Sequence, residues 1–279
     1  MIRLSPKFTQ AVAVALLGAA TLLTLAVLVF IIFFVLERGL PTVTLSFLLD
    51  NPKDMGRAGG IFPTLVGTLL LPLLAIGIAL PLGVGTAVYL SEYTLENRAT
   101  KAIRFGTDSL AGIPSIIFGL FGFIFFVVML KLGWCLLSGG LTLAIMVLPT
   151  IIRTSEEAIR AVPSSYREVS FSLGATCWQT VLKVVLPNAV PGIVTGVMLS
   201  LGRSIGETAA VIFTCGSSLR MPHSIFDSAR TMSVHFYILA REGISTENAY
   251  GTAAVLVISV LLVNMVSYWL MHRFIAKRS

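Results

Sequence analysis

The stretch Arg167–Pro187, REVSFSLGATCWQTVLKVVLP, lies between two long apolar segments and predicts a pair of short helices joined at a glycine. Ser165 and Glu168 have the spacing of a capping box, in which each side chain satisfies a free backbone amide at a helix start. Gly174 can then end that helix, because glycine adopts the left-handed conformation without steric cost. We therefore expect a first short helix between Ser165 and Gly174.

A second short helix follows the glycine. Thr176 and Gln179 form a second capping box. Leu186 and Pro187 mark the point where we expect this helix to end and the next apolar segment to begin. The whole connection, about residues 153–189, predicts a compact projection that a partner protein could bind in a groove. An ordinary capped loop between two spans is the alternative interpretation.

Around this connection, the chain has the composition of a membrane protein. Of its 279 residues, 56% are hydrophobic and only 12% are charged, whereas soluble domains carry about 25% charged residues. Apolar runs of about 18 residues or more can cross the hydrocarbon layer, and helices satisfy their own backbone groups there. We expect an all-α integral membrane protein with six transmembrane helices, near residues 11–36, 62–90, 108–130, 133–152, 190–214 and 250–271.

The first apolar stretch, residues 11–36, is longer than the core of a secretion signal, which has about 7–15 residues. We therefore expect a retained helix, within an N-terminal part (residues 1–59) that ends with the first outer loop. Residues 60–272 would form the transmembrane domain and residues 273–279 a short tail. A tight turn near Lys131–Gly133 would join the third and fourth spans.

The basic residues predict an orientation. Twelve of the twenty lysines and arginines fall at the termini and in the loops on one side of the predicted membrane, and seven on the other. Because basic residues favour the cytoplasm, we expect both termini and the connection 153–189 to lie inside the cell. The net charge of +7 does not indicate nucleic-acid binding, because the charges lie in short loops and not on one soluble face.

Two charged residues, Arg203 and Glu207, stand inside the fifth predicted span, in the stretch Leu201–Ala210, LGRSIGETAA. A charge at mid-membrane costs at least about 2.5–3.5 kcal/mol. Four positions apart, the two share one helix face and can pair. One interpretation is a structural ion pair. The other is a water-accessible pathway, in which the guanidinium binds a tetrahedral oxyanion and the carboxylate admits only one that still carries a proton.

The projection resembles a cytoplasmic motif of ABC importer permeases, written EAA-x3-G-x9-I-x-LP. The triplet Glu168–Ser170 is EVS here, and Gly174 follows in register. Val184 replaces the isoleucine, and Leu186–Pro187 completes the motif. In that family this helix-turn-helix is the coupling element that docks on a separate ATPase. The resemblance implies a coupling role for Ser165, Glu168, Gly174, Leu186 and Pro187.

Further stretches are similar to the phosphate permeases of this family, more to the PstA type than to the PstC type. They are AVYLSEYT around Tyr89, LAGIPSIIFGLFG from Leu110, LPTIIRTSEEAIRAVP from Leu148, GRSIGETAA from Gly202 and the outer MSVHFYILA. The resemblance covers about residues 60–272. It implies alternating access, a heterodimer with the sister permease PstC, two copies of the ATPase PstB, and an external phosphate-binding protein, PstS. Arg203 and Glu207 would lie in the substrate path.

The ATPase itself is not expected on this chain. The phosphate-binding loop G-x4-G-K-[ST] is absent from the sequence. The string Leu137–Gly140, LSGG, imitates an ABC nucleotide-binding signature, but at the mouth of an apolar span we interpret it as helix-packing sequence. The three cysteines and three histidines are scattered, so no disulfide or metal site is indicated. We expect no enzyme activity and no bound cofactor, with ATP and magnesium used by the partner ATPase.

Rival functions remain open from the sequence. One is an ABC permease for sulfate, molybdate or amino acids. A second is a secondary transporter driven by an ion gradient, although such proteins often have paired broken helices, and only the second span, with Pro63, Pro72 and Pro81, is conspicuously broken here. A channel or a purely structural membrane protein is a third.

Overall fold

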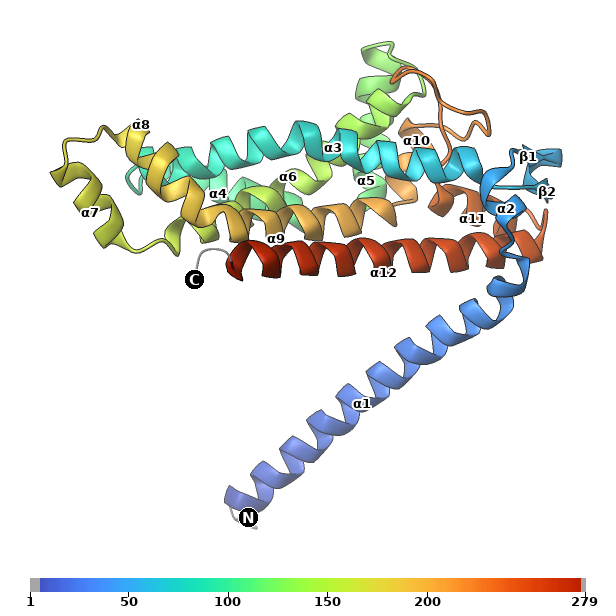
Figure 1. The fold of residues 1–279 in the computed structure, drawn as a ribbon, viewed down its shortest axis with the longest axis horizontal. Coiled ribbons are helices and arrows are strands. Elements are labelled where there is room, and N and C mark those ends of the chain that lie inside the picture. Colours follow the sequence, from blue (N-terminus) through green and yellow to red (C-terminus); the bar gives the residue numbers. More distant parts are fainter. Residues whose placement is uncertain (1–5, 277–279) are drawn as a thin grey trace.

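The computed structural model describes residues 6–276, which are mostly helical (Figure 1). The long helices are α1 (Pro6–Gly39), α3 (Phe62–Val88), α6 (Leu136–Arg160), α9 (Leu186–Ile205) and α12 (Thr246–Ala276). The shorter ones are α2 (Leu45–Leu49), α4 (Arg98–Ala111), α5 (Ser115–Gly122), α7 (Ser164–Ser172), α8 (Cys177–Thr180), α10 (Ala209–Thr214) and α11 (Met232–Arg241).

Irregular helical turns and one small hairpin complete the chain. The π-helical turns are η3 (Tyr89–Tyr93), η4 (Phe123–Met129) and η5 (Val181–Val185), and the 3-10 turns are η1 (Leu40–Thr42) and η2 (Asp54–Gly56). The strands β1 (Pro52–Lys53) and β2 (Ala58–Gly59) pair antiparallel. The predicted helical architecture is confirmed. This hairpin, with strands of two residues each, is the one β-structure within residues 6–276 and was not predicted.

Five helical stretches are long and apolar enough to cross a membrane. They are Gln10–Thr42, Phe62–Tyr93, Leu136–Arg160, Cys177–Ile205 and Thr246–Val266. A sixth crossing arises if the pair Arg98–Ala111 and Ser115–Met129, which is bent by 102°, forms a single span. The chain is therefore a multi-pass membrane protein with five such helices, or the expected six spans if the bent pair counts as one.

The third span was predicted over residues 108–130, which places its start several residues before the apolar helix begins. Residues 108–111 belong to α4, an amphipathic helix that carries several charges, and the apolar helix starts only at Ser115. Pro114 separates the two because its extended conformation (φ −58°, ψ 140°) cannot continue α4. The predicted turn after this span is confirmed, since Lys131 and Gly133 have positive φ values of 54° and 73°.

The predicted fifth span, residues 190–214, is not one helix. Its helical stretch starts at Cys177 and passes through Pro187, where the missing amide is accommodated by the π-helical turn η5 just before it. The stretch ends at Ile205, and α10 starts only at Ala209. Gly206 begins the break, because glycine stabilises a helix poorly.

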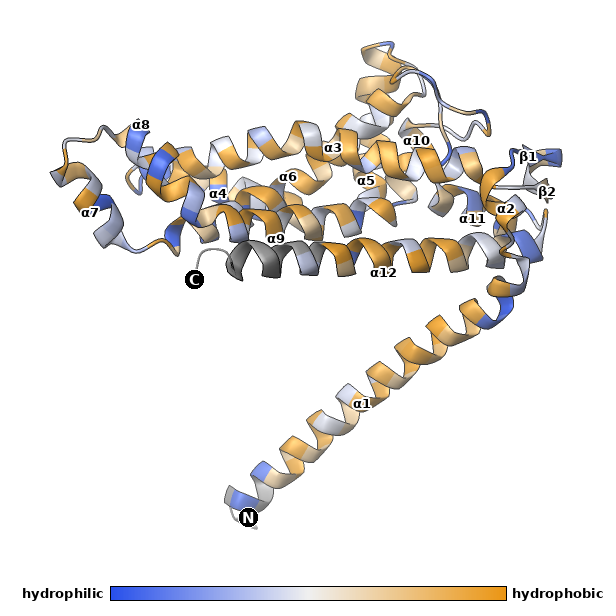
Figure 2. Cartoon of the chain, viewed as in Figure 1, coloured by the Kyte–Doolittle hydropathy of each residue, from blue (hydrophilic) through white to orange (hydrophobic). Residues whose placement is uncertain are grey.

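The centre of the bundle is formed by α3, α6 and α9. Leu71 and Ala79 of α3 pack with Leu143 and Val147 of α6 in one buried cluster. The α1 helix differs from these three, since its spanning window has no buried residues. Only the C-terminal end of α1 meets the bundle, and the rest of the helix extends away from it (Figure 1). The α1 helix is apolar along most of its length (Figure 2).

The two ends of the bundle carry different elements. At one end α7 and α8 project beyond the long helices, and the first turn of α1 and the last turn of α12 point to the same end (Figure 1). At the other end lie β1, β2, α2 and α11. Arg3, Lys277 and Arg278, which entered the count of basic residues, lie outside the described residues.

Candidate functional site

The α7–α8 projection (residues 164–180) begins differently from the prediction. Pro163 occupies the cap position of α7 and makes no side-chain cap hydrogen bond, so the predicted capping box of Ser165 and Glu168 is wrong. Ser165 already lies inside the first turn, because the extended conformation of Pro163 (φ −56°, ψ 138°) sets the helix start at Ser164. Glu168 is exposed. Its carboxylate has no hydrogen bond or ion pair within residues 6–276, which leaves it available to a partner.

The glycine turn of the projection matches the prediction. Gly174 has a φ of +84°, a conformation that side-chain-bearing residues rarely adopt. The amide of Ala175 donates to Ser170 O at 3.1 Å, which closes the end of α7. Thr176 and Gln179 then form the predicted capping box, with hydrogen bonds of 2.9 and 3.3 Å. The two short helices and their turn are thus held in one shape.

The base of the projection is buried. Ser170 and Thr180 share a hydrogen bond of 2.8 Å, which ties α7 to α8. Leu186 packs beside a buried cluster that includes Val88, Ile159 and Val185. Leu186 and Pro187 therefore stand at the junction of the projection and the bundle, although the helix continues through them.

The outer surface of the projection is unusually apolar. Leu173 leaves 83% of its surface exposed, and Tyr166, Val169, Phe171 and Trp178 are also exposed. Together with the free carboxylate of Glu168, these side chains form a surface with the chemistry of a protein interface. Sequence spacing located the motif but not these apolar side chains.

An ion pair that the sequence did not predict joins the projection to the bundle. Arg167 of α7 donates from Nε and Nη2 to the Glu92 carboxylate, the shortest distance being 2.6 Å. Glu92 lies in η3, at the end of the span that contains α3. The Arg167 guanidinium also donates to Ile159 O at 3.0 Å and to Val162 O at 2.7 Å, at the end of α6.

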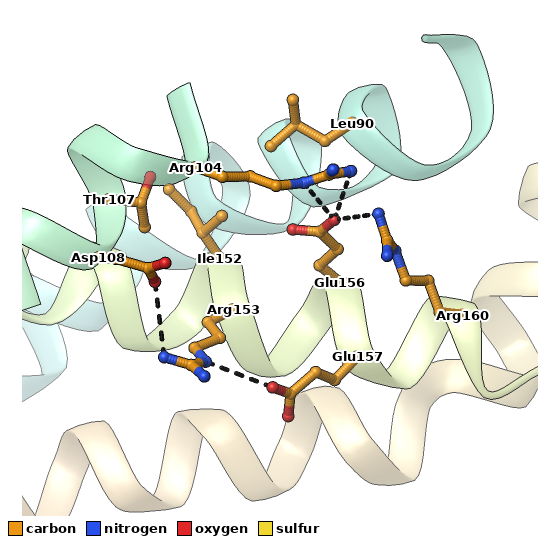
Figure 3. A pocket seen from close by; sticks show the side chains of 9 residues that line it. All are labelled: Leu90, Arg104, Thr107, Asp108, Ile152, Arg153, Glu156, Glu157 and Arg160. Carbon is orange, nitrogen blue, oxygen red and sulfur yellow. Dashed lines mark hydrogen bonds and ion pairs between the residues drawn. The ribbon is translucent and has the colours of Figure 1, made fainter. Parts of the chain in front are cut away.

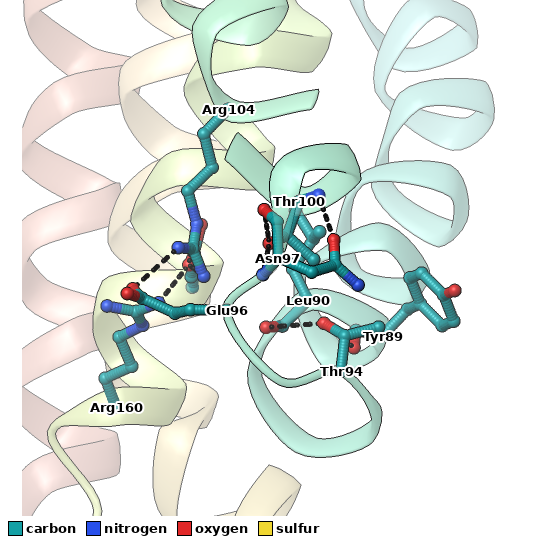
Figure 4. Close-up of polar contacts among 9 residues, drawn as sticks. Tyr89, Leu90, Thr94, Glu96, Asn97, Thr100, Arg104 and Arg160 are labelled. Carbon is teal, nitrogen blue, oxygen red and sulfur yellow. Dashed lines mark hydrogen bonds and ion pairs between the residues drawn. The ribbon is translucent and has the colours of Figure 1, made fainter. Parts of the chain in front are cut away.

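A second ionic cluster lies beside the same end of α6 and lines a cavity of about 210 Å³. Arg104 of α4 and Arg160 both reach Glu156 Oε1, at 2.9 and 2.8 Å (Figure 3). Glu96 also contacts Arg104, at 3.2 Å, from the segment before α4 (Figure 4). In this cavity Arg153 pairs with Asp108 and Glu157. The cluster fixes α4 on α6, and each of its arginines is paired with at least one carboxylate.

Arg203 lies just before the helix break, and Glu207 lies within it. Arg203 is exposed in the last turn of α9, and Glu207 is half-buried between α9 and α10. They form no ion pair with each other, so the expected shared helix face is wrong, because the helix ends at Ile205. Glu207 instead accepts a hydrogen bond from Ala210 N at 3.4 Å. Its backbone carbonyl accepts one from Ser233 Oγ of α11 at 2.8 Å.

Arg230, just before α11, and His235 within α11 form a buried pair that sequence reasoning missed. Arg230 Nε donates to Ser217 O at 2.8 Å, and Nη1 donates to His235 Nδ1 at 3.3 Å. Burial, and then the adjacent guanidinium, lower the pKa of His235 to about 4. The imidazole is therefore neutral at physiological pH, and its Nε2 atom is buried without a partner within the described chain.

Comparison with known proteins identifies the family. The profile described as binding-protein-dependent transport system inner membrane component matches residues 79–279. The chain is 33% identical over 280 residues to the probable ABC transporter permease protein YqgI of Bacillus subtilis (strain 168), with 95% of each chain covered. It is 33% identical to the phosphate transport system permease protein PstA 1 of Mycobacterium tuberculosis (strain ATCC 25618 / H37Rv), over 98% of this chain and 90% of that protein.

Other similarities agree. The chain is 30% identical to the phosphate transport system permease protein PstA of Pasteurella multocida (strain Pm70), over 85% of both chains. In fold it is similar to a chain of a bacterial alginate ABC transporter, with a TM-score of 0.69, 16% identity and 95% coverage of both chains. It is also similar in fold to a chain of the MetNI methionine ABC transporter, with a TM-score of 0.59 and 24% identity, over 77% of this chain and 94% of that one.

The expected resemblance to ABC importer permeases, and to those of the PstA type, is confirmed by these relatives. The fold is the one found in the membrane subunits of ABC importers. The chain belongs to the family of inner membrane components of binding-protein-dependent transport systems.

Proposed function

We propose that this chain is the PstA-type permease subunit of an ATP-driven importer of inorganic phosphate. Family membership supports the permease role, and the relatives named phosphate transport system permease support the substrate. The observation that carries the coupling role is the α7–α8 projection, with its fixed glycine turn, free Glu168 carboxylate and apolar surface. A movement imposed on such a rigid element is passed to the spans that hold its base.

The partners follow from this role. A sister permease of the PstC type pairs with the chain in the membrane, and two copies of the ATPase PstB bind ATP with magnesium. The projection docks on one of these ATPase subunits. PstS delivers phosphate from outside. This chain binds no cofactor of its own and is not an enzyme, since the phosphate-binding loop of an ATPase is missing from its sequence.

The orientation places the projection in the cytoplasm. The preponderance of basic residues on that side supports this assignment. The last turn of α12 lies on the side of α7 and α8, and α1 slants toward that side (Figure 1), which supports a cytoplasmic location of both termini in the cell membrane. Within it, residues 60–272 form the permease domain, preceded by residues 1–59 and followed by a tail of residues 273–279.

The break between α9 and α10 is the part of the substrate path that this chain supplies. Irregular backbone at membrane depth occurs where it is enclosed by protein or lines a water-filled cavity. Arg203, in the last turn of α9, has no ion pair within residues 6–276, and its guanidinium can bind phosphate through two parallel hydrogen bonds. Glu207, within the break, selects an anion that can still donate a proton, which phosphate can and sulfate cannot.

Two measurements separate this proposal from its rivals. Uptake of labelled phosphate in the presence of unlabelled sulfate, molybdate or amino acids tests the substrate. Dependence on ATP, measured with the membrane potential collapsed by an ionophore, separates an ATP-driven importer from a gradient-driven transporter. Strong competition by sulfate would contradict the phosphate assignment, and loss of uptake with the ionophore alone would contradict the ATP-driven mechanism.

A further inference from the structure

The Arg167 guanidinium is shared by three parts of the chain. It belongs to α7, it binds the Glu92 carboxylate at the end of the α3 span, and it caps the carbonyls of Ile159 and Val162 at the end of α6. Its side chain is 19% exposed, and that of Glu92 is 9% exposed. The contact is therefore largely shielded from water, where ionic hydrogen bonds are strongest.

The chemistry of each contact favours arginine. The end of a helix presents carbonyl groups without intrahelical partners and carries partial negative charge. A guanidinium can bind such carbonyls with one edge while the Glu92 carboxylate neutralises it along another edge. A lysine ammonium is a point charge and cannot span the carboxylate and both carbonyls in one fixed geometry.

No other polar side chain of α7 makes this connection within residues 6–276. Ser170 bonds to Thr180 of α8, and Ser172 bonds back to the carbonyl of Glu168 in its own helix. Meanwhile Glu168 and Val169 are exposed on the surface proposed to meet the ATPase. Arg167, next to Glu168 in sequence, is thus the polar link between that surface and the ends of two spans.

We propose that Arg167 is the positioning residue that transmits movement of α7 to the α3 and α6 spans, through Glu92 and the carbonyls at the end of α6. The inference rests on the proposed function, since it assumes that an ATPase moves α7. Without this contact, ATP hydrolysis continues but moves the spans less efficiently. The number of substrate molecules imported per ATP hydrolysed is therefore the quantity that Arg167 and Glu92 control.

The experiment uses the full complex, purified with its sister permease and ATPase and reconstituted with the phosphate-binding protein. Uptake of labelled phosphate and ATP hydrolysis are measured on the same vesicles for wild type, Arg167→Gln and Glu92→Gln. Arg104→Gln is the matched control, because Arg104 is similarly enclosed and paired with Glu156 but does not touch α7. If the wild-type complex fails to link uptake to ATP, the proposed function is wrong, independently of Arg167.

In the expected result, both variants assemble and import at least about tenfold less phosphate per ATP, a loss of the size that removal of one strong ionic contact gives. Arg104→Gln keeps the wild-type ratio. A wild-type ratio in assembled Arg167→Gln would overturn the proposal. If the glutamine variants do not assemble, Arg167→Lys and Glu92→Asp decide: a lowered ratio supports the link, and an unchanged ratio overturns it.

Reversing the charges separates the two halves of the contact. In the double variant Glu92→Arg, Arg167→Glu, the ion pair can re-form, but a carboxylate at position 167 faces the carbonyls of Ile159 and Val162. We expect the ratio to stay low. Full recovery of coupling would show that the α6 carbonyls play no part and would overturn the three-way link.

Discussion

Gly196 of α9 lies directly against Thr154 of α6, and this contact sets how closely the two helices approach. A Cβ atom at Gly196 would overlap Thr154 Oγ1, whose hydroxyl already donates to Thr150 O at 2.8 Å. Gly192 contacts Ala158 in the same way one turn nearer the α7–α8 projection. Close approach through small residues is the usual packing of membrane helices, and here it brings α9 onto the helix whose end Arg167 caps.

The first prediction concerns this packing. Gly196→Leu should lower the stability of the purified protein by about 1–3 kcal/mol or more, because the added side chain forces α9 away from Thr154. Thermal unfolding in detergent measures the effect. Gly77→Leu is the control, since no atom lies within 4 Å of a Cβ built there. Equal stability of the two variants would show that the α6–α9 approach is not tight.

The second prediction concerns the glycine turn. Gly174→Val should abolish most transport while the protein still inserts, because valine resists the +84° φ that fixes the projection, at a cost of about 1–2 kcal/mol. The strain is confined to the backbone, since a Cβ at this position meets no atom within 4 Å. Phosphate uptake and membrane insertion are measured in parallel.

Gly133→Val is the control for this strain. Gly133 also has a positive φ, 73°, and open space around its Cβ position, but it lies in the turn after η4, away from the projection. We expect it to insert and transport much as wild type does. Wild-type uptake by Gly174→Val would contradict the coupling role of the projection.

The third prediction concerns selectivity. Glu207→Gln should lower the preference for phosphate over sulfate by about tenfold, the effect of about 1.4 kcal/mol, because an uncharged amide no longer repels a fully ionised anion. Competition between labelled phosphate and unlabelled sulfate measures it. Glu242→Gln, at an exposed position beyond α11, is the control. An unchanged preference in Glu207→Gln would show that Glu207 does not determine the selection of phosphate over sulfate.

The fourth prediction concerns acid stability. The pKa of His235 is lowered from its ordinary value of 6.5 to about 4 by burial and by Arg230. The folded state therefore favours the neutral imidazole. The contribution of His235 to the free energy of unfolding is fully present above pH 6.5. As the pH falls towards 4, up to about 3 kcal/mol of this free energy is lost.

Thermal unfolding between pH 4 and 7 tests this dependence. His235→Gln should flatten the curve in that window, because the titrating group is removed. His223→Gln should leave it as in wild type, since His223 lies on an exposed part of the loop. Identical pH dependence in His235→Gln and wild type would assign the acid sensitivity to other groups.

Much of the architecture could be predicted from the sequence. A span must be a long apolar run because it lies in lipid, whatever the tertiary contacts are. Gly174 and the capping box of Thr176 were predictable for a similar reason, since both depend on local backbone chemistry. The Ser165 box failed because Pro163, two residues earlier, occupies the cap position of α7. Hydropathy could not find the break at Gly206, since the polar stretch around it is short and the helices α9 and α10 that flank it are both mainly apolar.

The site was predictable only in part. Arg203 and Glu207 drew attention because charges are rare within apolar spans, but the prediction that they share a helix face is wrong, since the helix ends at Ile205. Arg167 and Glu92 stand 75 positions apart, so only the fold brings them together. Arg230 and His235 are only five positions apart, but the polar composition of their segment suggested an ordinary outer loop and not a buried pair.

Coupling of phosphate import to ATP hydrolysis is tested most directly by uptake into vesicles that contain the complete complex and its phosphate-binding protein. We expect uptake with ATP and magnesium on the ATPase side, no uptake with a non-hydrolysable analogue, and loss of most uptake when Gly174 is replaced by valine. Uptake that persists without any hydrolysable nucleotide would contradict this coupling.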